Sequence, residues 1–294
     1  MSAATTSVPG ARAATALRSG PTSGRVVSAE WTKLLSLRSP WWTAAVTVLV
    51  AGVITYLSAQ ASSVDPGFDP VQSLPLGLAL AQIGPLVLGV LAGAGEFRTG
   101  AFRTTFALVP RRWPVLAAQV LVVGAFALGT AVLTTTACVV GVLPSARSRG
   151  IAVDLTAGDT PGLLLGMVGL VVGLALLGLA LGALLRRTVP ALVTGLLLVL
   201  VLPIVLMTAA DPLAGGGDPA ALGALDAAAT TTPLGTLAVL TPGTAAQLLA
   251  TEASAGPMPG APDLGPVGGG LVLAAWVLVL LAAAGLRLRT RDLR

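Results

Sequence analysis

The residues of this sequence best suited to binding chemistry lie in one stretch, residues 95–112, which combines glutamate, arginine and phenylalanine. Phe97, Phe102 and Phe106 follow each other at roughly helical spacing, and they are three of the five phenylalanines in the chain. A loop that only joins two helices does not require three aromatic side chains. Exposed aromatic side chains bounded by charges are typical of a contact with another protein. Burial against lipid headgroups, with Arg98 and Arg103 bound to phosphates, explains the same spacing equally well.

Few other residues could support catalysis. The sequence contains no His, and Cys138 is its only Cys. This excludes His-based acid/base catalysis, a His or multi-Cys metal site and a disulfide within the chain. No G-x-x-x-x-G-K-[ST] motif occurs, and Lys33 is the only lysine, so the chain lacks a P-loop for nucleotide phosphates. We expect Cys138 to be an inert buried thiol.

The composition indicates that these residues are carried by a membrane protein. Hydrophobic residues make up 55% of the 294 residues and charged residues only 10%, whereas a soluble domain carries roughly 25% charge. The apolar residues also occur in long uncharged blocks, each able to hold the roughly 20 residues that cross a hydrocarbon core. Strand alternation is absent, so we predict an all-α integral membrane protein with six transmembrane helices. The predicted spans lie near residues 41–59, 75–95, 113–142, 162–185, 189–209 and 268–286.

The positions of the basic residues predict the orientation of these spans. Of the 17 Lys and Arg residues, 15 fall on one side of the membrane and two, Arg147 and Arg149, on the other. Because basic residues are enriched in cytoplasmic loops, both termini are predicted to be cytoplasmic. The net charge of +5 is then a topology signal. Since the basic residues are spread over four separate segments, we expect no nucleic-acid partner.

A second candidate contact surface precedes the first span. Val27, Trp31, Leu34 and Leu35 share one helical face, and Glu30, Lys33 and Ser36 lie away from it. This pattern predicts an amphipathic helix over residues 28–39, closed by Pro40, which lies in the inner membrane interface and can dock a cytoplasmic partner. A cytoplasmic extension of the first span is the alternative. Residues 1–23 are predicted to be a disordered cytoplasmic tail, although an organelle transit peptide has a similar composition.

The predicted spans offer little chemistry of their own. No Asp, Glu, Lys or Arg falls inside them, which argues against a proton-coupled transporter and a two-Asp intramembrane protease. Gln82, Thr130 and Thr134 could line a path for an amphiphilic substrate, or they could simply pack between helices. Glycines four residues apart would allow helices to approach closely, although a chain this rich in glycine contains such pairs by chance. These pairs are Gly89/Gly93, Gly162/Gly166, Gly169/Gly173 and Gly178/Gly182.

The region between the fifth and sixth spans, residues 211–267, is long for a connection and is predicted to be external. It contains acidic but no basic residues. The segment 234–250 is apolar enough to form a re-entrant or interfacial pair of helices. A flexible external loop is the alternative.

Residues 95–112, which we call the Phe-rich stretch, resemble a motif of a known family. Glu96-Phe97-Arg98-Thr99-Gly100, followed by Arg103-Thr104-Thr105 and Val109-Pro110-Arg111-Arg112, resembles the pattern E-[FY]-R-x-G-T-x-[RK]-x-T-x-x-x-x-P-R-R. That pattern follows the second span in ABC-2 type ABC-transporter permeases. Ala101 stands where the pattern usually has Thr.

The start and end of the chain extend this resemblance to about residues 24–294. Glu30-Trp31-Thr32-Lys33-Leu34, with Leu37-Arg38-Ser39 and Trp41-Trp42, resembles the opening E-W-x-K-L-x-x-x-R-S-x-W of the same family. Two further similarities are looser: residues 240–245 resemble an L-P-x-x-A segment, and Arg291-Asp292 resembles a closing R-R-D in which Thr290 replaces the first Arg.

The resemblance implies a membrane permease subunit, forming a homodimer or heterodimer and driven by a separate ATPase that binds ATP and Mg²⁺. The excess of Arg over Lys, 16 to 1, with abundant Ala, Gly, Leu and Val, is typical of a GC-rich bacterial genome, so we expect a bacterial cell membrane. Its coupling helix corresponds to about residues 96–109 and its interface helix to about residues 26–39, which include Glu30, Trp31, Lys33 and Leu34. Glu96, Arg98 and Arg103 would make polar contacts to the ATPase. Phe97, Phe102 and Phe106 would fill its groove, and Gly100 would allow a close approach or a turn.

The function expected from the resemblance is export of a hydrophobic or amphiphilic substrate, such as a drug, a lipid-like molecule or a peptide. In this expectation the chain is not an enzyme and holds no cofactor itself. Two alternatives stay open. One is a membrane scaffold or assembly protein, and the other is an ion-independent secondary transporter.

Overall fold

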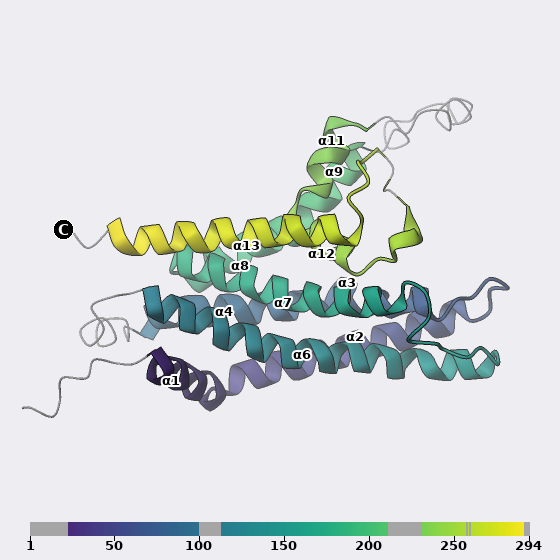
Figure 1. Cartoon of the computed structure of the whole chain (residues 1–294), viewed down its shortest axis with the longest axis horizontal. Helices are drawn as coiled ribbons and strands as arrows, with labels where there is room; N and C mark the ends of the chain where they lie inside the picture. Colours follow the sequence, from purple (N-terminus) through teal and green to yellow (C-terminus); the bar gives the residue numbers. More distant parts are fainter. Residues whose placement is uncertain (1–22, 100–112, 211–230, 257, 259, 291–294) are drawn as a thin grey trace, which may run out of the picture.

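The computed structural model describes residues 23–99, 113–210, 231–256, 258 and 260–290, and every regular element in these residues is helical (Figure 1). The helices are α1 (Ser23–Ser36), α2 (Arg38–Ser62), the 3₁₀ helix η1 (Val71–Gly77), α3 (Leu78–Ala81), α4 (Ile83–Thr99), α6 (Trp113–Ser148), α7 (Thr160–Leu185), α8 (Thr188–Leu196), the π-helical turn η2 (Leu197–Val201), α9 (Leu202–Ala210), α11 (Pro233–Val239), α12 (Pro242–Leu249), the 3₁₀ turn η4 (Ala253–Ala255) and α13 (Gly265–Thr290). The all-α prediction is confirmed for the described residues.

Six helical segments in the described part of the chain are long and apolar enough to cross a membrane. They coincide with the six predicted spans, because hydrocarbon offers no hydrogen-bond partner and the backbone must bond within each segment. An even number of spans brings both ends of the bundle sequence to one side, and α1 and the C-terminal end of α13 lie at the same end of the bundle (Figure 1). The segments are Arg38–Ser62, Val71–Gly95, Pro114–Ser148, Thr160–Leu185, Thr188–Ala209 and Gly265–Arg287.

The centre of the bundle is the contact between α4 and α7. A Cβ atom at Gly89 would lie 1.9 Å from the carbonyl oxygen of Ala175, and one at Gly178 would lie 2.3 Å from that of Leu86. The next glycine in each helix, four residues on, makes the same kind of approach. Two of the four glycine pairs noted in the sequence therefore face each other, and their missing side chains allow the two backbones to touch.

The second span is interrupted in its first half. It begins as η1, which contains Pro75, continues as α3 and resumes as α4 after Gln82. Pro85 lies in the first turn of α4. Because proline has no N–H to donate and 3₁₀ turns bond differently from α-helix, the span cannot run as one regular helix.

The fifth span contains a different irregularity, the π-helical turn η2 just before Pro203. Pro203 cannot donate to the carbonyl of Val199 four residues earlier. Gly243 of α12 lies against that carbonyl, since a Cβ at Gly243 would be 2.0 Å from the Val199 oxygen. The helix pair predicted over residues 234–250 is present as α11 and α12, and α12 packs against α7 and α13.

The third span is the longest, as its uncharged block suggested. α6 has 36 residues, and an α-helix of that size is about 54 Å long, well beyond a hydrocarbon core of about 30 Å. It is continuous, with Pro144 near its C-terminal end, so it extends past the predicted boundary at residue 142 without a turn.

Most described basic residues lie at one end of the bundle and most described acidic residues at the other, with Glu30 of α1 an acidic residue at the basic end. The basic end carries α1, the link between α7 and α8, and the C-terminal end of α13, with Arg25, Lys33, Arg186, Arg187 and Arg287. The acidic end carries Asp65, Asp69, Asp154, Asp159, Glu252 and Asp263. Arg147 and Arg149 are the basic residues at the acidic end among those described.

Candidate functional site

The predicted amphipathic helix is α1, and it packs against protein along much of its apolar face. Leu34 is only 7% exposed and lies in a cluster with Val122, Val123 and Phe126 of α6. Val27 and Leu35 border the same cluster. Trp31, assigned to the same face, is 39% exposed. A helix is present over Ser23–Ser36, and part of the face expected to meet lipid is covered by α6.

The boundary between α1 and the first span lies at Leu37, whose φ of −83° and ψ of 138° are extended. The two helices are therefore separate, and the alternative of a continuous extension is wrong. The prediction that Pro40 closes α1 is also wrong. Pro40 is buried in the first turn of α2, where a missing N–H costs no hydrogen bond.

Trp41 holds α1 and α2 together at this corner. Its indole Nε1–H donates to the carbonyl oxygen of Leu35 over 3.2 Å. Its ring meets Phe126 edge-on, with the ring centroids 5.5 Å apart. This T-shaped geometry is favourable for aromatic pairs. The corner therefore fixes the position of α1 relative to both α2 and α6.

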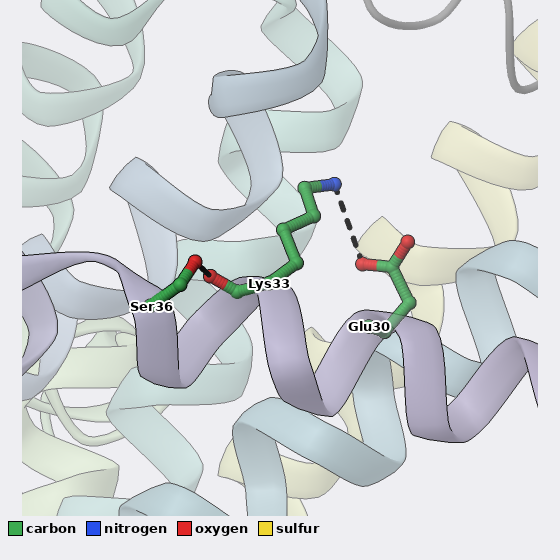
Figure 2. Close-up of polar contacts among 3 residues, drawn as sticks. All are labelled: Glu30, Lys33 and Ser36. Carbon is green, nitrogen blue, oxygen red and sulfur yellow. Dashed lines mark hydrogen bonds and ion pairs between the residues drawn. The ribbon is translucent and has the colours of Figure 1, made fainter.

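The polar face of α1 carries a short ion pair (Figure 2). Lys33 Nζ lies 3.4 Å from Glu30 Oε2, and the side chain of Glu30 is only 13% exposed against 43% for Lys33. Ser36 Oγ donates to the carbonyl oxygen of Lys33 over 2.8 Å. Glu30 was predicted to face away from the buried side of the helix, yet its carboxylate is largely covered.

The Phe-rich stretch falls mainly outside the described residues. Gly100, Phe102, Arg103 and Phe106 are among residues 100–112, which the structure does not describe. Glu96, Phe97 and Arg98 belong to the last turn of α4, which continues the second span to Thr99 instead of ending at Gly95. The predicted coupling helix over about 96–109 therefore begins, in the described part, as an extension of α4 at the basic end.

The three residues predicted to line a pathway are buried. Gln82 is 1% exposed and its Nε2 donates to the carbonyl oxygen of Ala79 over 2.7 Å. Thr130 and Thr134 are 7% and 0% exposed, and each hydroxyl donates to the carbonyl four residues earlier in α6. Such bonds satisfy a hydroxyl within its own helix. The packing interpretation therefore describes these side chains better than the pathway interpretation does.

Thr130 does line one narrow crevice between α2, α4, α6 and α7. Thr43, Thr47 and Gly84 form part of its wall. The crevice has room for about one water molecule. It is too small for an amphiphilic substrate, and the two threonines of α2 are polar lining residues that the sequence interpretation did not single out.

Arg149 at the acidic end and Arg186 at the basic end bind main-chain carbonyls of other segments. Their positions in the sequence did not predict these contacts. Arg149 donates from Nη1 to the carbonyl oxygen of Ser63 over 2.6 Å and from Nη2 to that of Asp65 over 3.2 Å, which ties two links of the acidic end together. At the basic end, Arg186 donates from Nη2 to the carbonyl oxygen of Arg287 over 3.3 Å.

Acidic residues from three links meet at the acidic end. Burial raises the pKa of Glu252 above its ordinary value of 4.5, and the nearby charges of Asp69 and Asp159 raise it further. Asp159 Oδ2 also accepts a hydrogen bond from the backbone N–H of Ser254 over 3.2 Å. In the described residues, no group of three or more Asp, Glu, Cys or His side chains is placed to hold a metal ion.

Comparison with known proteins assigns no family to the chain. No model of a known protein family matches it, and no curated protein gives a significant match. The family resemblance therefore depends on the two motifs in the sequence itself.

Proposed function

We propose that this chain is the permease subunit of an ABC transporter that exports a hydrophobic or amphiphilic substrate. A separate ATPase subunit binds and hydrolyses ATP with Mg²⁺, and a second permease copy, identical or related, completes the pathway. The observation that carries this proposal is the pair of motifs at residues 30–42 and 96–112. The six apolar helices supply the membrane domain that such a subunit needs.

The proposed location is the plasma membrane of a bacterial cell, with both termini in the cytoplasm. The support is the distribution of basic residues, 15 against two in the sequence, together with the separation of described charges to the two ends of the bundle. Positive residues are retained on the cytoplasmic side during insertion. The Phe-rich stretch would then face the cytoplasm, where an ATPase subunit can reach it.

The packing of the bundle suggests how the ATPase would act on the spans. In our proposal, closure of the ATPase pushes the end of α4 through Glu96 and the segment after α4 through Phe102 and Arg103. Because α4 contacts α7 backbone to backbone through glycines, the two helices must move as one body. Since α1 is held on α6 by Leu34 and by the Trp41 corner, a push on α1 would also reach the bundle.

The substrate would pass between two permease copies. The crevice lined by Thr130 has room for about one water molecule, so it cannot serve as the route. The outer helices α2 and α13 instead expose large apolar side chains, including Leu49, Leu57 and Leu278. These surfaces suit lipid, a second copy or an amphiphilic cargo.

Copurification with the ATPase tests the proposal most directly. The ATPase should be encoded beside this chain, and it should copurify with the tagged permease. Glu96→Ala and Phe102→Ala should each weaken that association and reduce transport, because they remove a polar and an apolar contact. Arg147→Ala, an exposed residue at the opposite end, is the matched control. Undiminished copurification and transport in both variants would remove the proposal.

A further inference from the structure

We propose that Arg187 and Arg287 together hold the phosphate of an anionic lipid headgroup where α7, α8 and α13 meet. This site lies at the basic end of the bundle. The inference goes beyond the transport proposal and does not depend on an ATPase partner, because it concerns only the chain and the membrane around it.

Arg187 and Arg287 each lie directly beside an apolar segment of the bundle. The apolar segments of the fourth and fifth spans end at Leu185 and begin at Thr188, so only Arg186 and Arg187 separate them. In the sequence, the uncharged run of the sixth span ends at Leu286, directly before Arg287. Because a two-residue link spans at most about 7 Å, it cannot carry Arg187 far from the hydrocarbon. Both arginines therefore lie at the boundary, directly below the headgroup layer.

Two hydrogen bonds join the end of α13 to the end of α7. Arg186 Nη2 donates to the carbonyl oxygen of Arg287 over 3.3 Å. Arg287 Nη1 in turn donates to the carbonyl oxygen of Leu184, near the end of α7. These bonds fix the end of α13 against the α7–α8 link. The guanidinium of Arg287 is thereby held in place and is half-buried, with one of its nitrogens used.

The guanidinium groups of Arg187 and Arg287 keep N–H donors that can bind an anion. Arg187 is exposed and forms no side-chain bond to the first turn of α8. Among the described residues, no carboxylate lies within ion-pair distance of Arg187 or Arg287. A guanidinium that lies next to apolar surface and has no carboxylate partner is stabilised by an anion. Guanidinium binds phosphate oxygens in pairs, and lipid phosphate is the anion that a membrane supplies at this height.

The test uses the full-length protein in nanodiscs and native mass spectrometry. The protein is reconstituted with equal amounts of phosphatidylglycerol and phosphatidylcholine. After the protein is released from the nanodisc, the lipid molecules still bound to it are counted. The wild-type protein should retain phosphatidylglycerol in preference to phosphatidylcholine. Each basic residue near a membrane surface adds about fivefold to anionic lipid binding, so Arg187→Gln should lower retention about fivefold and the double variant with Arg287→Gln about thirtyfold.

Arg187→Gln keeps the test valid if the double variant folds poorly, because the exposed Arg187 side chain does not cap α8 and pairs with no described carboxylate. Arg147→Gln, which removes an exposed arginine from the acidic end, should leave retention unchanged. Equal retention in wild type and Arg187→Gln would overturn the proposal, and so would an equal loss in Arg147→Gln. Complete displacement of the lipid by excess inorganic phosphate would overturn the lipid assignment.

Discussion

Arg186 and Arg287 each hydrogen-bond the main chain at the end of the other's helix. Arg186 Nη2 donates to the carbonyl oxygen of Arg287 over 3.3 Å, and Arg287 Nη1 donates to that of Leu184. The last carbonyls of a helix have no partner within it and carry partial negative charge, so a guanidinium is well placed there. These two hydrogen bonds hold the ends of α7 and α13 together at the same height in the bundle.

Arg186 also has an unusual backbone, which leads to a first prediction. Its φ of 58° is the only positive value for a residue other than glycine in the described part of the chain. A side chain in this left-handed conformation costs about 1 kcal/mol that glycine does not incur. Arg186→Gly should therefore be more stable than Arg186→Ala by about that amount, although both lose the guanidinium bond. Thermal unfolding in detergent compares the two variants, and a lower unfolding temperature for Arg186→Gly would contradict the left-handed turn.

The central glycine contact gives a second prediction. A Cβ at Gly178 would lie 2.3 Å from the carbonyl oxygen of Leu86, whereas one at Gly162, in the same helix, would meet nothing within 4 Å. Gly178→Ala should destabilise the protein by about 1–3 kcal/mol because the backbones must separate. Gly162→Ala should be neutral or stabilising by up to about 1 kcal/mol, since alanine favours helix. Both are measured by thermal unfolding, and equal stability of the two variants would show that α4 and α7 are further apart.

The six spans could be predicted from the sequence because one physical constraint determines them. A charged residue is costly in hydrocarbon, so the charges of this chain fall between apolar blocks of sufficient length. The two-residue link Arg186-Arg187 marks one such boundary, and the helices end and begin directly beside it. The same constraint says nothing of where a helix is irregular. The 3₁₀ start of the second span and the π-turn before Pro203 depend on local backbone bonding.

The partners of individual residues could not be predicted because they depend on which helices become neighbours. Four glycine pairs looked alike in the sequence, yet Gly89 and Gly178 contact backbone while Gly162 faces open space. The apolar face of α1 could have met lipid or protein, and spacing alone cannot distinguish them. Arg149 was one of two basic residues on the minority side, and nothing in the sequence indicated that it binds the carbonyls of Ser63 and Asp65.

The acidic end gives a third prediction, on pH. Burial, with Asp69 and Asp159, raises the pKa of Glu252 in the folded protein. The folded state then binds this proton more tightly than the unfolded state does. The contribution of protonated Glu252 to folding stability is therefore fully present below the ordinary pKa of 4.5, and it is lost as the pH rises through the raised pKa. Unfolding temperatures measured from acid to neutral pH should fall less steeply with rising pH in Glu252→Gln than in wild type. An unchanged slope would contradict the raised pKa.

Asp154 should behave with the opposite sign. Hydrogen bonds from the Thr156 hydroxyl, at 2.7 Å, and from its backbone N–H, at 2.8 Å, lower the pKa of Asp154 below its ordinary value of 3.8. The contribution of ionised Asp154 to folding stability is present above the ordinary pKa, and it is lost as the pH falls through the lowered pKa. Thr156→Ala should raise the pKa of Asp154, measured by NMR titration of the carboxyl carbon. A pKa that stays low in this variant would mean that the hydroxyl is not its main cause.

The orientation of the bundle is the last prediction, and the sequence makes it simple to test. Cys138 is the only cysteine and is 0% exposed, so the native protein should react little with a membrane-impermeant maleimide. Asp154→Cys introduces a thiol at the exposed acidic end, and Arg187→Cys introduces one at the exposed basic end. If basic residues stay in the cytoplasm, intact cells should label Asp154→Cys fully, while Arg187→Cys should label only after permeabilisation. Labelling of Arg187→Cys in intact cells would show that the bundle has the opposite orientation. In that orientation a cytoplasmic ATPase could not reach the Phe-rich stretch.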